Sequence, residues 1–259
     1  MTTIVEQEQM NKAVTSALSA TSKRVIDCFA KSKFNTPSST SSVYSSPPQL
    51  VAVSKTKPVH LLQACYDAGH RHFGENYVQE IIEKVPQMSK DIKWHFIGPI
   101  QSNKVNNLIN KTWPHLHVIE TVGSLKLANK LENAVGRVIK DPSLAKLSAD
   151  TEGSSKTEPR TDPMRVLLQI NTSGETQKSG VAPGEEAVAL AQHVVNEVSW
   201  CGKWGFYFVG VVAEKKRSIA SFFCIKEGRC LCCCGILFLM DIVVCFCFVF
   251  SFLLFSIIY

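Results

Sequence analysis

Short apolar runs alternate with helical segments through most of this chain, and this alternation constrains the fold more than any other feature of the sequence. The expected strands span residues 50–57, 72–76, 92–97, 116–122 and 164–171. The expected helices span residues 59–68, 77–85, 124–135 and 183–198, and a further helix opens at 101–104. Strands that alternate with helices form parallel sheets covered by those helices, so the pattern predicts an α/β fold with about five βα units.

The first expected strand carries two lysines to its end, in the sequence LVAVSKTKP at residues 50–58. Side chains alternate along a strand, so Val51, Val53 and Lys55 share one face and an amine lies in line with apolar residues. Such burial lowers the pKa of a lysine and makes its amine a nucleophile for a carbonyl, the start of Schiff-base chemistry. The proline that follows places this lysine at the C-terminal edge of the sheet, where α/β folds locate their chemistry. The alternative is that Lys55 and Lys57 are two solvated lysines at the end of a strand.

Four separated motifs carry a resemblance to a known family. They are LVAVSKTKP at 50–58, HFGENYVQE at 72–80, WHFIG with QSNK at 94–104, and QINTSGE at 169–175. In sequence and order they resemble the motifs of the pyridoxal phosphate homeostasis proteins, which are related to the N-terminal barrel of alanine racemases. This resemblance implies a single-domain TIM-type (β/α)₈ barrel that carries and buffers pyridoxal 5′-phosphate (PLP), the vitamin B6 cofactor, without catalytic turnover. Barrels of about 250 residues are normal, and this chain has 259 residues.

The resemblance also implies roles for individual residues. Lys55 would hold PLP as an internal Schiff base, and Lys57 would be the neighbour that does not. Asn76 and His95 would line the cofactor site. The polar residues at 101–104 have a second explanation, because ordinary capping of a helix needs the same residue types without any ligand.

The family pattern ends at residue 194, and the motifs of the later barrel strands do not follow it. The sequence therefore predicts a partial (β/α)₈ barrel over residues 49–199, with weak or no stable cofactor binding. Residues 200–259 form an unrelated, cysteine-rich hydrophobic tail, for which translation of non-coding sequence such as a retained intron is one hypothesis. Loss of the barrel's final strands would remove the loops on which such barrels bind phosphate.

Residues 231–259 contain a single charged residue, Asp241, and exceed the roughly 20 apolar residues needed to cross a bilayer. Two outcomes are open: a hydrophobic C-terminal helix that anchors the chain in a membrane, or a disordered tail that aggregates. The cysteines at 230–234 could be palmitoylated in an anchored chain or hold zinc, but no neighbouring histidine or second cysteine pair supports the metal, and an accident of composition is the favoured explanation.

The remaining segments complete the expected domain organisation. Residues 1–31 have helical spacing of apolar residues and predict an amphipathic helix. Residues 32–48 are rich in Ser, Thr and Pro and predict a flexible linker. Residues 137–163 are polar without apolar periodicity and predict a loop insertion in the barrel.

Composition excludes several classes of function. The net charge of +6 comes partly from the tail and forms no basic stripe, which argues against nucleic-acid binding. Only Cys28 and Cys65 of the ten cysteines precede residue 201, so the globular part is expected in a reducing compartment, the cytoplasm. No metal site is expected, because His70 and His72 lack a completing set of ligands.

Three functions remain open from the sequence. The first is a PLP carrier that supplies PLP-dependent apoenzymes. The second is a racemase-like PLP enzyme, for which no second domain supplies the opposing tyrosine. The third is a tail-anchored membrane protein whose barrel is only a scaffold.

Overall fold

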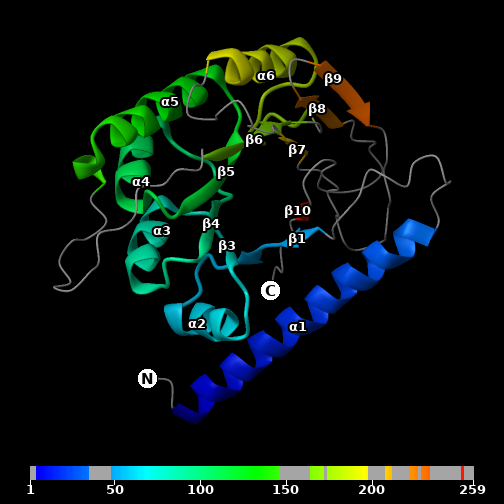
Figure 1. Ribbon diagram of the computed structural model, residues 1–259, viewed down its shortest axis with the longest axis vertical. Helices are drawn as coiled ribbons and strands as arrows, with labels where there is room; N and C mark the ends of the chain where they lie inside the picture. The colour runs from blue at the N-terminus through cyan, green and yellow to red at the C-terminus, as the bar shows by residue number, and fades with distance from the viewer. Residues whose placement is uncertain are drawn as a thin grey trace.

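The fold is organised by a parallel sheet of six strands that follow one another in chain order (Figure 1). The computed structural model describes residues 4–34, 48–145, 164–171, 174–197, 208–211, 222–226, 229–233 and 252–253. The sheet comprises β2 (Ala52–Val53), β3 (His72–Glu75), β4 (Lys93–Phe96), β5 (Leu116–Val122), β6 (Arg165–Ile170) and β7 (Phe208–Val211). Every neighbouring pair in it is parallel, which is the arrangement that alternating βα units predict.

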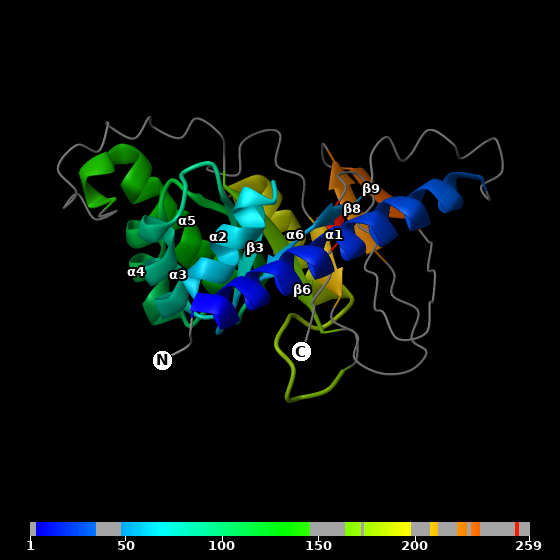
Figure 2. The same cartoon turned by 90° about the horizontal axis from the view of Figure 1, so that it is seen from below.

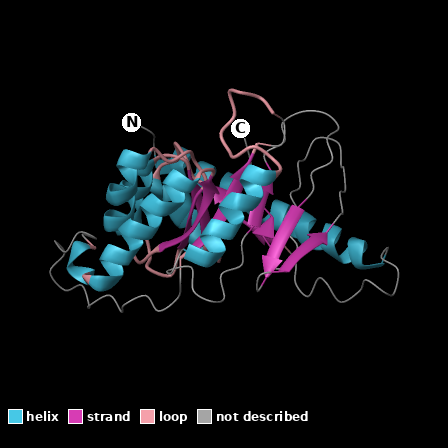
Figure 3. Cartoon of the chain, turned by 90° about the horizontal axis from the view of Figure 1, so that it is seen from above, coloured by secondary structure: helices cyan, strands magenta, loops and turns pink. Residues whose placement is uncertain are grey.

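Helices connect these strands and cover the outer side of the sheet (Figure 1). They are α2 (Val59–Asp67), α3 (Val78–Lys84), α4 (Val105–Thr112), α5 (Leu125–Lys140) and α6 (Glu185–Glu197). Short 3-10 turns η1 (Val85–Gln87), η2 (Ser102–Lys104) and η3 (Pro142–Leu144) extend or precede them. Seen from above, the strands in magenta lie inside the layer of helices in cyan (Figure 3).

The main hydrophobic core lies between the sheet and these helices. Phe73, Trp94 and Phe96 are fully buried on the outer face of β3 and β4, and they belong to one cluster with the buried residues of the helices. The helices contribute Leu62, Ile81, Leu108, Leu131 and Leu190 to this cluster. Burying one such side chain stabilises the fold by roughly 1.5–3 kcal/mol, so this layer carries much of the stability.

A long N-terminal helix, α1 (Ile4–Phe34), packs against α2 on the outside of the domain (Figure 2). Leu18 is buried and joins the main core cluster, and Val25 is buried further along the helix. The prediction of an N-terminal helix is confirmed, but the helix extends to Phe34 and so enters the segment that was expected to be a linker.

Two small sheets complete the described fold. β1 (Gln49–Leu50) pairs in parallel with β10 (Phe252–Leu253), and β8 (Phe222–Lys226) forms an antiparallel hairpin with β9 (Arg229–Cys233). These strands correct the expectation of a C-terminal helix or disordered tail, because residues 231–233 and 252–253 are extended and paired. The rest of the stretch 231–259 lies outside the described residues. Within the part that the structure does describe, no helix has the length and apolar character needed to span a membrane.

The structure corrects two further boundaries. The five expected βα units run from β2–α2 to β6–α6, and the parallel sheet has a sixth strand, β7, inside the segment that was assigned to the tail. Helix α5 continues to Lys140 and is followed by η3, so the segment 137–163 begins as helix rather than as loop. The apolar periodicity of α5 is carried to its end by Val138, which is buried.

Candidate functional site

Lys55 lies on a tight turn at the C-terminal end of β2. The Lys57 backbone N–H donates to the Ser54 carbonyl oxygen at 3.1 Å, which closes a four-residue turn with Lys55 at its second position. Thr56, the third residue of the turn, has φ = 58°, in the left-handed region that β-branched residues rarely adopt. The strand ends at Val53, so the expectation that Lys55 continues the strand is wrong, although its side chain is half-buried.

Asn76 lies at the same edge of the sheet as Lys55. Val53 is in register with Gly74, and the Ser54 N–H continues the pairing by donating to the Gly74 carbonyl oxygen at 2.8 Å. Lys55 and Asn76 are each the second residue after this pair, so both follow their strands at this edge. Asn76, like Lys55, is half-buried.

A glycine on the neighbouring strand fixes the position of Asn76. A Cβ atom on Gly98 would collide with the Asn76 carbonyl oxygen, so only glycine permits this approach. The Gly98 carbonyl oxygen in turn accepts a hydrogen bond of 2.6 Å from the buried Thr121 hydroxyl. The WHFIG motif thus places its glycine against the backbone that carries Asn76.

His95 lies deeper in the fold than Lys55 and Asn76. His95 is in register with Gly74, which is itself in register with Val53. Lys55 follows Val53 by two residues, so His95 lies about 7 Å before the level of Lys55 along the strand direction. Its neighbours Trp94 and Phe96 belong to the core cluster on the helix side, so His95 faces the inner side of the sheet. His95 is fully buried, and its ring nitrogens lie within hydrogen-bond distance of His72 and Glu120.

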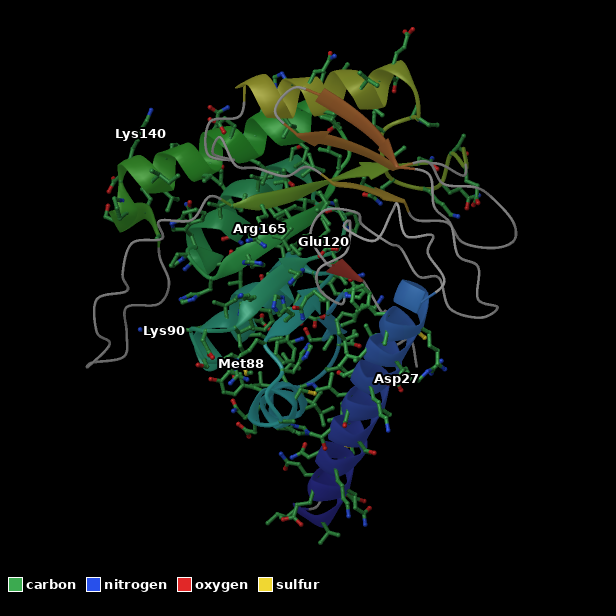
Figure 4. All side chains as sticks on the ribbon, turned by 45° about the vertical axis from the view of Figure 1, so that its right-hand side comes forward. Asp27, Met88, Lys90, Glu120, Lys140 and Arg165 are labelled. Atoms are coloured by element: carbon green, nitrogen blue, oxygen red, sulfur yellow. The ribbon has the colours of Figure 1, made fainter. Side chains whose placement is uncertain are left out.

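A chain of three titratable side chains crosses this inner face. Glu120 Oε1 is 2.7 Å from His95 Nδ1, and His95 Nε2 is 2.9 Å from His72 Nδ1. The pKa of His72 is lowered to about 3, chiefly because burial disfavours the charged ring and secondly because His95 is close. His117 packs its ring against both histidines, and Arg165 on the next strand lies 3.5 Å from the ring of His117. Figure 4 labels Glu120 and Arg165, which belong to these two neighbouring strands. His72 and Glu120 were not predicted, because their contact depends on strand register.

A second buried network lies directly under the Lys55 turn, on the helix side of the sheet. The Lys84 ammonium donates to Glu75 Oε1 and Glu80 Oε2, each at 2.7 Å, and to the Ser54 carbonyl oxygen at 2.8 Å. Glu80 Oε2 also accepts the backbone N–H of Thr56 at 2.7 Å. Both peptide neighbours of Lys55 are therefore held by charged side chains of α3, a contact that sequence periodicity did not reveal.

Glu75 is the deepest member of this network. Its side chain is fully buried, and burial raises the pKa of its carboxyl against the opposing effect of hydrogen bonds from Lys84 and Ser54. The Ser54 hydroxyl donates to Glu75 Oε1 at 2.7 Å, so the strand end, the next strand and α3 share one polar cluster. Glu75 and Glu80 belong to the HFGENYVQE motif, and their spacing from Lys84 was the available sequence signal.

The QINTSGE motif also ends at this edge of the sheet, after β6. The Asn171 side-chain amide donates to the Glu175 carbonyl oxygen at 2.8 Å, which folds the loop back on itself. Gly180 has φ = 124°, and a Cβ atom there would press on the Asn171 backbone. In the described residues, no group of three or more His, Cys, Asp or Glu side chains is placed to hold a metal ion.

Comparison with known proteins places this fold. The family model for the alanine racemase N-terminal domain matches residues 35–216. The chain belongs to the alanine racemase N-terminal domain family. This match continues past residue 194, where the sequence pattern was expected to end, and it includes β7 within the family domain.

Within this family, the chain is similar to curated proteins named pyridoxal phosphate homeostasis protein. The one from Mus musculus is 41% identical over 152 residues, which cover 57% of this chain and 47% of that protein. The one from Caenorhabditis elegans is 41% identical over 165 residues, which cover 62% of this chain and 59% of that protein. The chain thus spans about half the length of the curated relatives it matches.

A solved structure of the same fold comes from Bifidobacterium adolescentis and is described as that of an unknown protein. It is 24% identical to this chain, with a TM-score of 0.50, and the match covers 76% of this chain and 68% of that one. This likeness supports the α/β barrel-type fold alone.

Proposed function

We propose that this chain binds PLP through the amine of Lys55 and acts in the homeostasis of that cofactor. The observation that carries the proposal is the half-buried Lys55 at the C-terminal edge of the sheet, on a turn held at both neighbouring peptides. The names of the curated relatives, which share about two fifths of the aligned residues, support the same cofactor.

The residues at this edge fit the aldehyde end of PLP. Lys55 would hold the cofactor through its side-chain amine, and PLP would supply the aldehyde with which that amine condenses with release of water. Asn76 offers one amide donor and one amide acceptor at the same level for polar groups of the ring. His95 is engaged with His72 and Glu120, so its proposed part is to shape the floor of the site rather than to contact the cofactor.

The proposed role is carriage and buffering of PLP without turnover, in the cytoplasm, with release to PLP-dependent apoenzymes. PLP supplies an electron-withdrawing ring to the enzymes that use it, and a carrier needs only reversible bonding to the aldehyde. We also propose that binding is weaker than in a closed eight-stranded barrel. In the described residues the main sheet ends in two edges, β2 and β7, and Lys55 follows one of them.

Reductive trapping on the full chain tests the assignment. The wild-type chain, Lys55→Ala and Lys57→Ala are incubated with PLP, scanned by absorbance, reduced with borohydride, digested and mapped by peptide mass. We expect an absorbance band and a stable adduct on Lys55 in the wild type and in Lys57→Ala, and neither at this position in Lys55→Ala. An adduct confined to Lys57, or no adduct in the wild type, would overturn the proposal.

A further inference from the structure

The Lys55 turn is closed in a conformation that its own sequence does not favour. Thr56 takes the left-handed conformation, with φ = 58°, at the turn position where glycine or asparagine is normally found. A threonine there persists only where the surroundings hold it. The peptide groups on either side of Lys55 set the direction of its side chain. The groups that hold Thr56 in its conformation therefore also determine where the Lys55 amine points.

The surroundings that hold Thr56 are side chains of α3. Glu80 Oε2 accepts the Thr56 N–H at 2.7 Å, and the same oxygen accepts from the Lys84 ammonium at 2.7 Å. Lys84 also donates to the Ser54 carbonyl oxygen at 2.8 Å, on the other side of Lys55. Lys84 and Glu80 therefore hydrogen-bond to the turn at the residues before and after Lys55, respectively.

Burial strengthens the hydrogen bonds that Glu80 and Lys84 make to the turn. The Lys84 side chain is 9% exposed and that of Glu75 is 0% exposed, so their charges meet in a site with little screening by water. All three N–H donors of the ammonium are used, on Ser54, Glu75 and Glu80. Glu80 is 24% exposed at the rim, where a substitution leaves the hydrophobic core intact.

We propose that Glu80 and Lys84 are positioning residues that select Lys55 over Lys57 as the lysine that bonds to an aldehyde. The inference rests on the proposed function and deepens it by assigning what sets the specificity of that site. Lys57 is exposed, on the far end of the same turn, and has the same chemistry as Lys55. When the hydrogen bonds from Glu80 and Lys84 are present, the Lys55 amine is held at the same edge of the sheet as Asn76. When they are lost, the turn relaxes, and the amines of Lys55 and Lys57 compete for the aldehyde.

The test compares the sites of reductive trapping in the full chain, using PLP as the aldehyde. We expect the ratio of Lys55 to Lys57 adduct to fall about tenfold in Glu80→Ala, because a charge-assisted hydrogen bond is lost. Glu80→Gln keeps an oxygen acceptor for the Thr56 N–H and should retain most of the wild-type ratio. Glu83→Ala removes an exposed carboxylate from the same helix and is the matched control.

A rescue variant distinguishes a loss of Lys55 positioning from a general loss of stability. Glycine adopts the left-handed conformation freely, so Thr56→Gly added to Glu80→Ala should restore the ratio toward the wild-type value. If Glu80→Ala does not fold, Glu80→Asp serves instead, because its shorter side chain keeps the charge near Lys84 and withdraws from Thr56. An unchanged ratio in folded Glu80→Ala, or in Glu80→Asp where it replaces Glu80→Ala, overturns the inference while leaving Lys55 as the binding residue, and so does a lowered ratio that Thr56→Gly fails to raise. A wild-type chain with no Lys55 adduct overturns the proposed function and this inference with it.

Discussion

His95 and Glu120 form a hydrogen bond of 2.7 Å between Nδ1 and Oε1 on the inner face of the sheet, with the His95 side chain fully buried and that of Glu120 9% exposed. A carboxylate only accepts hydrogen bonds, so Nδ1 of His95 donates to Glu120. The other ring nitrogen, Nε2, lies 2.9 Å from Nδ1 of His72, and one of these two nitrogens donates to the other. The two contacts join three side chains into one connected unit.

We expect Glu120→Leu to lower the free energy of unfolding by about 3 kcal/mol, because it leaves the buried His95 N–H without its acceptor. Glu120→Gln keeps an oxygen in place and should cost about 1 kcal/mol. Urea unfolding followed by circular dichroism measures both. Glu186→Gln, at an exposed position of α6, should change the value by less than about 0.5 kcal/mol. Equal losses in Leu and Gln variants would show that the hydrogen bond is not what Glu120 contributes.

The stability of the chain should fall as the pH is lowered from about 6.5 towards 3. The folded-state pKa of His72 is about 3, below the ordinary value of 6.5, so in this window the unfolded chain binds the extra proton. One such group gives a slope of about 1.4 kcal/mol per pH unit. His70, whose pKa burial also lowers, acts in the same direction. Glu75 acts oppositely above about pH 4.5, since its folded-state pKa is raised.

Unfolding of His72→Gln across pH 4–7 isolates this contribution. The stability of the variant relative to the wild type should improve as the pH falls, because the variant has no ring to protonate at that position. His193→Gln, on α6, where the ring lies 2.6 Å from the side-chain oxygen of Asn129 on α5, reports the background of removing a histidine outside this chain of contacts. A difference between His72→Gln and wild type that stays constant over this range would contradict the prediction.

Gly98→Ala should lower the free energy of unfolding by more than about 2 kcal/mol and weaken PLP trapping at Lys55. The added methyl group collides with the backbone oxygen of Asn76, which cannot move without disturbing the site. Gly136→Ala on α5 is the control, since nothing lies within 4 Å of the position that its methyl group would take, and alanine favours a helix. That control should be neutral or more stable by up to about 1 kcal/mol, measured by the same urea titration.

Leu18→Ala should cost about 2–4 kcal/mol, because this side chain is 7% exposed and links α1 to the main core. Ile26→Ala, on the same helix but 55% exposed, should cost less than about 0.5 kcal/mol. Thermal unfolding of both variants checks the difference. Similar values for the two would show that α1 is not docked through Leu18.

Periodicity alone located the strands and helices where one side of each element is buried. Strand β5 was predicted with its observed bounds, since Leu116–Val122 is rich in apolar and β-branched residues and has buried residues on both faces. Helix α5, which follows it, was predicted to end too early, because the polar residues of its last turn obscure the apolar periodicity that the buried Val138 continues. Strand β7 was missed, because its four residues lie in a segment that departs from the family motifs and resembles a hydrophobic tail in composition.

The site was predictable where it depends on one strand and its exit. Lys55 and Asn76 each follow a strand, and parallel strands bring such residues to one edge. The contacts of His72, His95 and Glu120 depend on the register between three strands, including a shift between Trp94 and His95, which no single-strand pattern encodes. The Glu80–Lys84 pair has the spacing of an ordinary surface ion pair, and only the docking of the turn above it makes it buried.

The order of the main sheet has a consequence for synthesis on the ribosome. Each strand from β3 to β7 pairs with the strand that precedes it in the chain, so every newly emerged unit can dock on an edge that already exists. Growth of the domain can then be vectorial, with each nascent edge protected as soon as the next strand arrives. β1 differs, because its partner β10 follows all six of these strands in the chain, and Gln49 and Leu50 can pair only after β7 has emerged.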